Sequence, residues 1–461
     1  MQNLTEQQIW NSSTLSNISN VSFGQGTFDV RYEIVNASDV PFPASSVANS
    51  TTATAVNMTV IGKVPGNDGV MIQRTMSQRA LKLPSAAQFA LFWGRNPGAT
   101  LSMSRVTIEG NYWSIGSTSF SSSAVYNGTA YKPTTATFTG ASANQKDITY
   151  PYFSNISTFS ATFSTPAINA TFYTTLMNSF NATIDSCGNR TTDVTMDSDF
   201  VLSGTLCCRN FNAVTTKNTR ITIRGSGFIV ANEFVGLANQ SNSGTQVLNI
   251  TPTTGDIVIL SNRTLTVNRG SGGGTTRVNI TGTPMYAVYL YARASNSNDE
   301  NLTVDQESLT NITNAMLLSP TRIIVQGDAS IYNSTLFVGD NPAGVNNVLQ
   351  ISGRLTVVGN NTSPCSVLSL GRSSPSLQID TSANVTGFMY QWDPGNTGTT
   401  TIAGQNQNRI VNITGTAIVN QFTGNALSFA NIVYDASAIP DPPPERFDGF
   451  ATSAQDSWNG L

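Results

Sequence analysis

The sequence contains no histidine, and this absence excludes several large classes of catalytic and metal site. Of its 461 residues, 23 are basic and 26 are acidic, which gives a formal net charge of −3. A chain without histidine has no Ser-His-Asp or Cys-His catalyst and no His-ligated metal. Only five residues are Lys, so the chain also lacks the basic surface that neutralises phosphates. The composition therefore predicts no nucleic-acid partner.

Long apolar runs are missing as well. The two most apolar stretches, 86–94 and 285–292, are much shorter than the roughly 20 residues of a membrane-spanning helix. Residues 1–20 have neither the basic start nor the apolar run of a signal peptide. We therefore expect no membrane insertion, and assembly without a secretion leader unless a leader is missing from this numbering.

Asn-x-Ser/Thr sequons are present in excess. The chain has 23 of them, whereas its composition predicts about 11 by chance. The excess is almost entirely in the Asn-x-Thr form, with 16 copies. Alternation along β-strands would place Asn and Thr on one strand face, but it should also enrich Thr-x-Thr, which stays near its chance frequency. The excess favours N-linked glycosylation, with strand alternation as the alternative.

Several of these sequons have an aliphatic residue in the middle position. On a strand, the central residue would point into the core while Asn and Thr face solvent. We expect Ile280 and Ile413 to be buried, and Gln in place of their Asn neighbours to be nearly neutral for folding. The predicted glycan acceptors on this outer strand face are Asn249, Asn279, Asn384 and Asn412.

Short alternating runs ending in glycine recur from about residue 215 onward. They have the form apolar-x-apolar-x-Gly, as in 221–225, 278–282, 349–353, 355–359 and 411–415. No window has the i, i+3, i+4, i+7 apolar spacing that predicts amphipathic helix. Strands this short, joined by polar turns, favour a solenoid of stacked coils. A multi-strand antiparallel sandwich would show similar alternation and remains the alternative.

This strand pattern resembles the right-handed parallel β-helix proteins of the pectin-lyase-like group, which includes surface and virion proteins. The resemblance covers residues 191–434 and rests on the spacing of the strands. It implies an all-β chain whose second domain, residues 191–436, is a parallel β-helix or solenoid.

Residues 1–190 have a different pattern. They contain longer predicted strands at 28–35 and 55–61, an aromatic-rich stretch at 150–163, and one helix-compatible segment at 76–93. We expect a separate β-rich domain here, of sandwich or jelly-roll type.

The last segment, residues 437–461, is predicted to be an extended tail. Four of the six residues 439–444 are Pro, which imposes an extended, polyproline-like exit from the folded body. Three large aromatic residues follow, Phe447, Phe450 and Trp458. Because aromatic anchors are typical of interfaces, we expect them to bind a pocket on an adjacent copy, the alternative being a disordered end.

The best candidate for acid–base chemistry or a Ca²⁺ site is a run of three acids, Asp193, Asp197 and Asp199. If the run is one strand, its even spacing places the three carboxylates on one face. Polysaccharide lyases and glycosidases need clustered carboxylates. The relatives on this scaffold that cleave galacturonans also use a histidine, which this chain lacks. We therefore expect that the protein is not an enzyme and that it needs no cofactor apart from N-linked glycans and, at this run, Ca²⁺.

The four cysteines allow one structural disulfide. Cys207 and Cys208 are adjacent in sequence, and Cys187 lies about twenty residues before them. A bridge from Cys187 to either Cys207 or Cys208 would close a loop of about one solenoid coil. The chain contains no C-x-x-C motif, which argues against zinc or thioredoxin-type sites.

Together these features predict a non-enzymatic, self-assembling structural glycoprotein of a virus particle surface or external layer. Its partners would be copies of itself, with other surface proteins or host glycans as further partners, and its location the virion or an extracellular surface. One alternative is a cell-surface S-layer protein or adhesin. The other is a β-helix protein that binds or cleaves carbohydrate.

Overall fold

The computed structural model divides the chain into two compact units. The first comprises residues 1–85, 149–168 and 447–461, and the second comprises residues 86–148 and 169–446. The structure describes residues 18–24, 26–35, 55–65, 71–81, 89–94, 99–121, 123–132, 136–140, 145–147, 170–213, 220–237, 244–268, 275–293, 301–304, 309–327, 329–340, 348–352, 356–358, 366–392 and 397–438.

The first unit contains a four-stranded antiparallel sheet in the order β1-β2-β3-β4. Its strands are β1 (Ile18–Phe23), β2 (Gly26–Val35), β3 (Ala55–Pro65) and β4 (Met71–Leu81). The strands predicted at 28–35 and 55–61 are therefore confirmed. Across the sheet, the buried Asp29 forms an ion pair with Lys63 at 2.7 Å. The described residues of this unit form this one sheet, so a sandwich or jelly roll stays a prediction.

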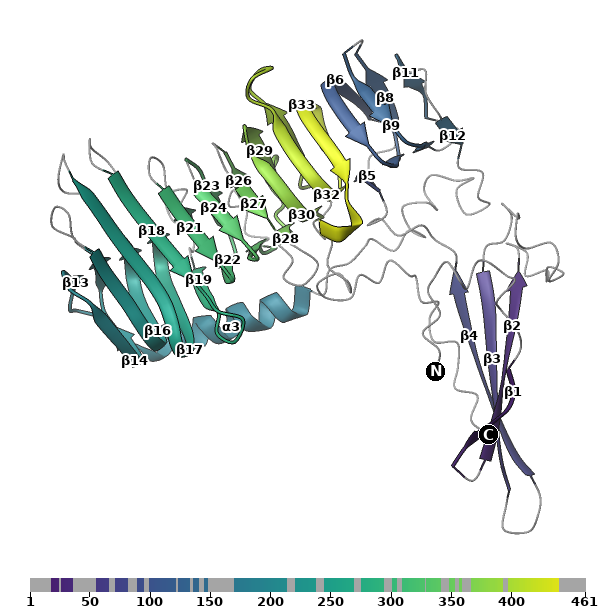
Figure 1. Cartoon of the computed structure of the whole chain (residues 1–461), viewed down its shortest axis with the longest axis horizontal. Helices are drawn as coiled ribbons and strands as arrows, with labels where there is room; N and C mark the ends of the chain where they lie inside the picture. Colours follow the sequence, from purple (N-terminus) through teal and green to yellow (C-terminus); the bar gives the residue numbers. More distant parts are fainter. Residues whose placement is uncertain are drawn as a thin grey trace. The chain divides into compact units, whose positions relative to one another are not determined.

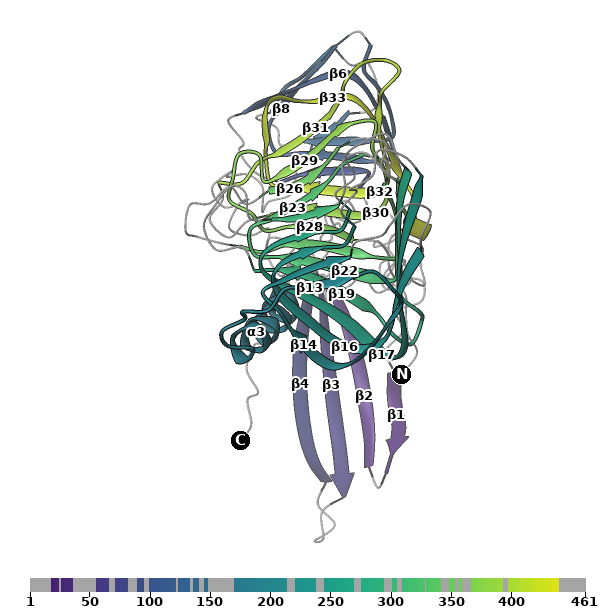
Figure 2. The same ribbon diagram turned by 90° about the vertical axis from the view of Figure 1, so that its left-hand side faces the viewer.

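The second unit is a solenoid in which almost every strand pairs, in parallel, with the strand one coil further on. Figure 2 shows the strands stacked coil upon coil. The first coils contain β13 (Val194–Met196), β14 (Phe200–Cys207), β15 (Asn210–Ala213), β16 (Arg220–Val235) and β17 (Thr245–Thr266). The middle coils contain β18 (Thr275–Thr281), β19 (Val288–Ala292), β20 (Leu302–Val304), β21 (Leu309–Thr313), β22 (Ala315–Ser319), β23 (Arg322–Val325), β24 (Ala329–Tyr332), β25 (Thr335–Val338) and β26 (Val348–Ile351). The next coils contain β27 (Thr356–Val358), β28 (Ser366–Ser369), β29 (Leu377–Thr381), β30 (Asn384–Gln391), β31 (Thr400–Gly404), β32 (Val411–Val419) and β33 (Phe422–Tyr434), and the 3₁₀ turn η4 (Ala436–Ala438) follows.

Each complete coil has three sides, which we call faces 1, 2 and 3. In the middle coils β18, β21, β24 and β27 form face 1, β19, β22, β25 and β28 form face 2, and β20, β23, β26 and β29 form face 3. The long strands β16 and β17 bend around corners and contribute to all three faces. The spacing of the strands in residues 191–434 therefore correctly predicted a parallel solenoid.

A continuous column of aliphatic side chains fills the solenoid behind face 1. Ile223, Ile250, Ile280 and Ile312 lie in register on successive coils, and Ile413 and Ile432 continue the column further along. Each of these six side chains is at most 1% exposed. The central residues of the Asn-x-Thr triplets thus point inward, as the alternation predicted, and burial of this column holds the coils together.

Two of the recurring glycines, Gly225 and Gly415, lie where one coil approaches the next closely. Gly225 has a φ of +111°, and a Cβ there would lie 2.2 Å from the carbonyl oxygen of Leu202. Gly415, with a φ of +126°, would place a Cβ 2.1 Å from the carbonyl oxygen of Gly387. Only glycine satisfies both the left-handed backbone and this close approach, which explains the glycine at these two positions of the repeated motif.

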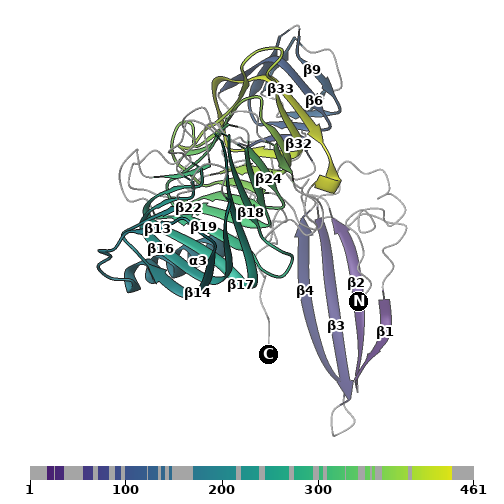
Figure 3. The ribbon, with the colours of Figure 1, turned by 60° about the vertical axis from the view of Figure 1, so that its left-hand side comes forward.

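Residues from the N-terminal half of the chain complete the far end of the solenoid. These residues form β5 (Leu91–Trp93), β6 (Thr100–Glu109), β7 (Tyr112–Ser114), β8 (Ser117–Phe120), β9 (Val125–Asn127), β10 (Ala130–Lys132), β11 (Phe138–Thr139) and β12 (Gln145–Asp147). Strand β5 pairs with β32, and β6 pairs with β33, all in parallel. In Figures 1 and 3 the blue strand β6 lies beside the yellow β33.

The helix α3 (Ala170–Ser186) packs along face 2. Its buried side chains recur at helical spacing, with Tyr173, Met177, Phe180 and Ile184 all turned toward the solenoid. The Tyr173 ring stacks on Phe337 of β25 with 4.2 Å between ring centroids. The i, i+4, i+7, i+11 pattern is that of an amphipathic helix. The expectation that such helices are nearly absent overlooked it, because Thr and Asn replace charged residues on the exposed side.

The structure divides the chain elsewhere than at the expected boundary between residues 190 and 191. Residues 86–148 and α3 belong to the solenoid unit, not to a separate N-terminal domain. The segment 76–93 that we considered helix-compatible contains part of β4 and all of β5. Residues 86–148 join the solenoid because β5 and β6 form parallel backbone pairs with β32 and β33, whereas β4 pairs with β3 in the antiparallel sheet.

Truncation of the inner column should destabilise the solenoid strongly. We expect Ile280→Ala or Ile413→Ala to lower the free energy of unfolding by about 2–5 kcal/mol, because each leaves a cavity in a closely packed interior. Chemical denaturation followed by circular dichroism measures the change. The exposed Thr281 on the same strand provides the control, and Thr281→Ala should change stability by less than about 0.5 kcal/mol. Equal effects of the Ile and Thr variants would contradict the inward orientation.

Candidate functional site: the asparagine ladders of face 1

The sequon asparagines of face 1 are hydrogen-bonded to one another across coils. Asn249, Asn279 and Asn311 occupy the same register position on β17, β18 and β21. Nδ2 of Asn279 donates to Oδ1 of Asn249 at 2.9 Å, and Nδ2 of Asn311 donates to Oδ1 of Asn279 at 3.1 Å. We call this set the first asparagine ladder.

A second ladder stands further along the same face. Asn384, Asn412 and Asn431 lie in register on β30, β32 and β33. Nδ2 of Asn412 donates to Oδ1 of Asn384 at 2.8 Å, and Nδ2 of Asn431 donates to Oδ1 of Asn412 at 2.9 Å. Between the two ladders the same column is occupied by Ser330 and Thr356.

The ladders give part of the Asn-x-Thr excess a structural cause, since five of the 16 Asn-x-Thr sequons belong to them. A carboxamide has both a donor and an acceptor, so identical Asn side chains at the coil spacing of about 4.8 Å satisfy each other indefinitely. Because a hydroxyl side chain is shorter, Thr does not bridge that spacing in the same way, and Thr-x-Thr has no comparable advantage. Strand alternation alone missed this distinction, since it treats all polar residues alike. The repeat of Asn at one register position was the signal in the sequence.

The ladder asparagines differ in how their amide nitrogens are used. Nδ2 of Asn279 and of Asn412 donates along the ladder, whereas Asn249 and Asn384 begin their ladders and take part in them as acceptors. Asn384 is exposed, and Asn249, Asn279 and Asn412 are half-buried. Since a glycan is attached to Nδ2, these four predicted acceptors are not chemically equivalent.

The three acids proposed as a metal or catalytic set do not converge on one face. Asp193 precedes the short strand β13, and Asp197 follows it, so the run is not a single strand. Asp193 forms an ion pair with Arg209, whose hydrogen bond lowers the pKa of that carboxyl. Asp199 accepts a hydrogen bond from the backbone N–H of Thr222 at 2.8 Å. Among the described residues, no group of three or more His, Cys, Asp or Glu is placed to hold a metal ion.

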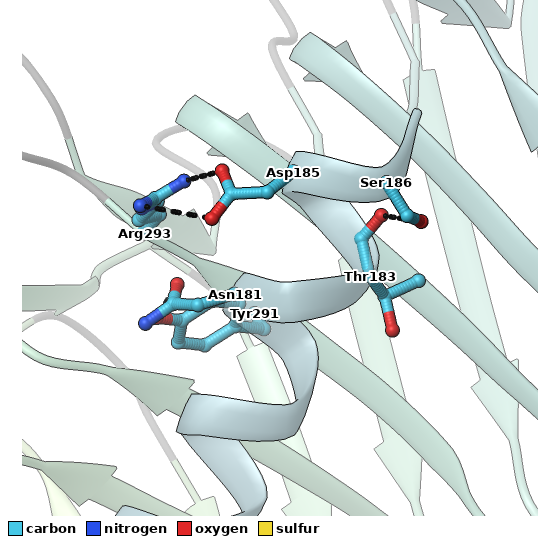
Figure 4. A network of polar contacts seen from close by, with 6 residues as sticks. All are labelled: Asn181, Thr183, Asp185, Ser186, Tyr291 and Arg293. Carbon is cyan, nitrogen blue, oxygen red and sulfur yellow. Dashed lines mark hydrogen bonds and ion pairs between the residues drawn. The ribbon is translucent and has the colours of Figure 1, made fainter. Parts of the chain in front are cut away.

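Other carboxylates of the solenoid also pair with arginines. Asp340 binds Arg372 through both carboxylate oxygens, at 2.5 and 2.7 Å. Asp185 at the end of α3 binds Arg293 at 2.5 Å (Figure 4). These bidentate pairs join one coil to another, or the helix to a coil, and they use the carboxylates for structural contacts.

The C-terminal end of α3 is attached to the solenoid at three places. Besides the Asp185–Arg293 pair, the hydroxyl of Tyr291 donates to Oδ1 of Asn181 at 2.8 Å (Figure 4). The third attachment is a disulfide between Cys187, directly after the helix, and Cys207 at the end of β14. It is the first of the two pairings that the sequence left open, and it joins the helix to the first coil.

Cys208, the partner in the second possible pairing, is a buried thiol. Its Sγ lies 3.7 Å from the carbonyl oxygen of Val230, and burial raises the pKa of the thiol to about 11. A thiol with so high a pKa is protonated at neutral pH and therefore unreactive as a nucleophile.

The predicted assembly residues Phe447, Phe450 and Trp458, and the Pro-rich segment 439–444, lie outside the described residues. In the part of the chain that the structure describes, no helix combines the length and the apolar character needed to cross a membrane.

Comparison with known proteins identifies no relative. The chain matches no protein-family model, no curated protein sequence and no solved structure.

Removing one asparagine from the middle of a ladder should destabilise the protein. Asn279 both donates and accepts along the ladder, so Asn279→Ala removes the ladder partner of the half-buried Asn249 and of the exposed Asn311. We expect a loss of about 1–2 kcal/mol. Against the expectation of near-neutrality, Asn279→Gln should also destabilise, because the extra methylene moves the amide out of register. Thermal and urea unfolding measure both variants. Asn408→Ala, in an exposed turn away from the ladders, is the control, and a loss of the same size there would contradict the ladder's role.

Proposed function

We propose that this protein is a non-enzymatic structural protein that assembles with copies of itself on the surface of a virus particle or in another external layer. The observation that carries the proposal is the parallel solenoid itself. Its coils stack from the coil of β13 at one end to β10 and β12 at the other. Hydrogen-bonded asparagines lie along face 1. Such a body has the properties of a rigid spacer. Each coil contacts only its neighbours, so the number of coils sets the distance between the two ends of the solenoid.

The use of the acidic residues supports a structural role over the carbohydrate-cleaving alternative. A glycosidase or lyase needs carboxylates that are free to exchange protons or bind an ion. In the solenoid, Asp193, Asp185 and Asp340 are each paired with an arginine. The hydrogen bond from Arg209 lowers the pKa of the Asp193 carboxyl, which is the opposite of what a general acid requires.

The remaining alternatives share the same scaffold. An S-layer protein or adhesin would also be a non-enzymatic external protein, and it would form sheets or bind a cell surface. A carbohydrate-binding β-helix would use one of its faces for an extended ligand. We further propose that the solenoid is a right-handed β-helix and that the first unit is a sandwich or jelly roll. Its partners would be copies of itself and, secondarily, surface proteins or host glycans.

Deleting residues 440–461 tests the assembly role of the tail. We expect the truncated chain to fold, by circular dichroism, yet to lose the large particles that the full chain forms in light scattering and electron microscopy. The reason is that Phe447, Phe450 and Trp458 would no longer reach an adjacent copy.

The matched control keeps the length of the tail and removes only the rings, as Phe447→Ala, Phe450→Ala and Trp458→Ala in one chain. It should behave like the deletion. Unchanged particles from either variant would exclude the tail as the connection between copies. A truncated chain that does not fold would show that the aromatics pack on their own unit.

The positions of glycans test the surface assignment. In protein from its native source we expect glycan mass increments, and more complete occupancy at Asn249 and Asn384 than at Asn279 and Asn412. The reason is that the last two use Nδ2 in the ladder. Peptide mass mapping after proteolysis measures occupancy at each site. Four unmodified asparagines would contradict N-linked glycosylation of face 1.

A further inference from the structure

In the described part of the chain, one end of the solenoid has no capping element. The first coil consists of β13 on face 3 and of β14, which bends from face 1 to face 2. Figure 1 shows both strands at one end of the stack. Among the described residues, β13 pairs only with β15 and β14 only with β16, both toward the second coil. Because a solenoid needs a terminal repeat with a polar outer surface to remain soluble, this end is a candidate for a contact.

The inner columns of the solenoid are only half-buried at this first coil. In the second coil, four inward side chains are 0% exposed, namely those of Phe211, Ala213, Ile223 and Ile229. Their register partners in the first coil are half-buried, namely Val194, Met196, Phe200 and Leu206. A further coil stacked on this end would remove these apolar side chains from water. The end of the solenoid therefore presents a section through its core.

The outer edge of β14 also presents backbone groups without a partner strand. The N–H of Cys208, directly after β14, donates to the carbonyl oxygen of Val230 on β16 at 2.9 Å. The carbonyl oxygens of Leu202 and Gly204 also lie toward the second coil, against glycines of β16. Since the backbone groups of successive strand residues point to opposite edges, the even-numbered residues of β14 face β16. The outer edge therefore carries the N–H and C=O groups of Val201, Ser203 and Thr205.

The two ends of the solenoid differ in how their edges are protected. Strand β14 contains no charged residue and no proline along its eight residues. At the opposite end, β10 and β12 contain Lys132, Lys146 and Asp147. Charged side chains on an edge strand discourage pairing with another strand. The edge of β14 is therefore the one that is open to pairing.

The pattern of β14 is complementary to itself. Phe200 and Leu206 continue the inner columns of the solenoid. Val201 and Thr205 point outward, and both pairs are symmetric about Ser203. A two-fold axis through Ser203 would set Phe200 of one copy opposite Leu206 of the other, and Val201 opposite Thr205. Inner residues would then meet inner ones, and the groups on the two outer edges would form an antiparallel ladder.

Strand β13 fits the same two-fold axis. It lies on face 3, opposite the corner at which β14 bends, and its inward residues Val194 and Met196 are symmetric about Thr195. One axis through both strands would bring these inward residues of the two copies together as well. It would also place Asp197 beside the Asp193–Arg209 ion pair of the second copy, with the guanidinium between two carboxylates.

We propose that two copies of this chain join end to end through their first coils, with their β14 strands paired antiparallel about Ser203. The occupant of each end is a second copy, because the inward positions and the edge register of β14 match their own image under one two-fold axis. Such an interface is closed and self-complementary, and it doubles the length of the solenoid. This inference rests on the proposed self-assembly and specifies one surface through which copies join.

A cysteine on the two-fold axis tests the pairing directly. Opposed residues of a hydrogen-bonded antiparallel pair have Cα atoms about 5.5 Å apart, a separation that a disulfide spans. We expect Ser203→Cys, in a full-length chain that also carries Cys208→Ser to remove the free thiol, to form a covalent homodimer on mild oxidation. Thr281→Cys, at an exposed position of β18 in the same background, is the control and should remain a single chain in non-reducing electrophoresis. A Ser203→Cys chain that stays single, or equal linking of both variants, would overturn the proposal.

A proline in β14 separates backbone pairing from chance collision. Added to the Ser203→Cys chain, Val201→Pro removes an N–H of the outer edge that β14 does not use toward β16, so the chain should fold but lose the link. Val201→Thr keeps that N–H and should retain the link. Circular dichroism shows whether each chain is folded. A folded Val201→Pro chain that links as completely as the Val201→Thr chain would overturn the proposal, and if the proline variant does not fold, the comparison of Ser203→Cys with Thr281→Cys decides.

Electron microscopy of the same chains separates this proposal from the proposed function. Large particles without a link at residue 203 would retain self-assembly and exclude the first coil as the interface. Covalent dimers without any larger assembly would retain the end-to-end contact and exclude the role as an assembled external layer.

Discussion

The structure of the solenoid depends on one constraint, which is that successive coils stay in parallel register. When register holds, like residues stack on like, so Ile223, Ile250 and Ile280 form one buried column. The same register places the corner glycines where a neighbouring carbonyl leaves no room for a Cβ. A slip of one residue would turn every inner side chain outward. The buried columns and the corner glycines therefore keep successive coils in one register.

The asparagine ladders follow from that register, and they connect stability with the most conspicuous feature of the sequence. An Asn-x-Thr triplet is the acceptor motif for N-linked glycosylation. On one face of a parallel solenoid, its Asn can also form hydrogen bonds with the Asn of the next coil. The two uses compete for the same atom, because Nδ2 of Asn279 and of Asn412 already donates to the next coil. The ends of the ladders are where both uses are compatible.

The order of coils in space differs from the order of residues in the chain. Because β5 and β6 extend the solenoid beyond β33, the body has an internal junction between early and late residues. Helix α3 and the Cys187–Cys207 disulfide attach the returning chain to the first coils. The coil at this junction is therefore built jointly from early and late residues of the chain.

Local pattern was enough to predict the all-β class, the parallel solenoid cadence, the inward orientation of Ile280 and Ile413, and a disulfide from Cys187. These properties depend on neighbours within a few residues or on spacing alone. The sequence did not show that residues 86–148 join the solenoid, that Asp193 pairs with Arg209, or that the sequon asparagines form ladders. Each of these is a contact between coils, and which coils meet is decided by the register and the path of the whole chain. Only the tertiary structure contains that information, because the free energy of stacking is gained between segments that are far apart in sequence.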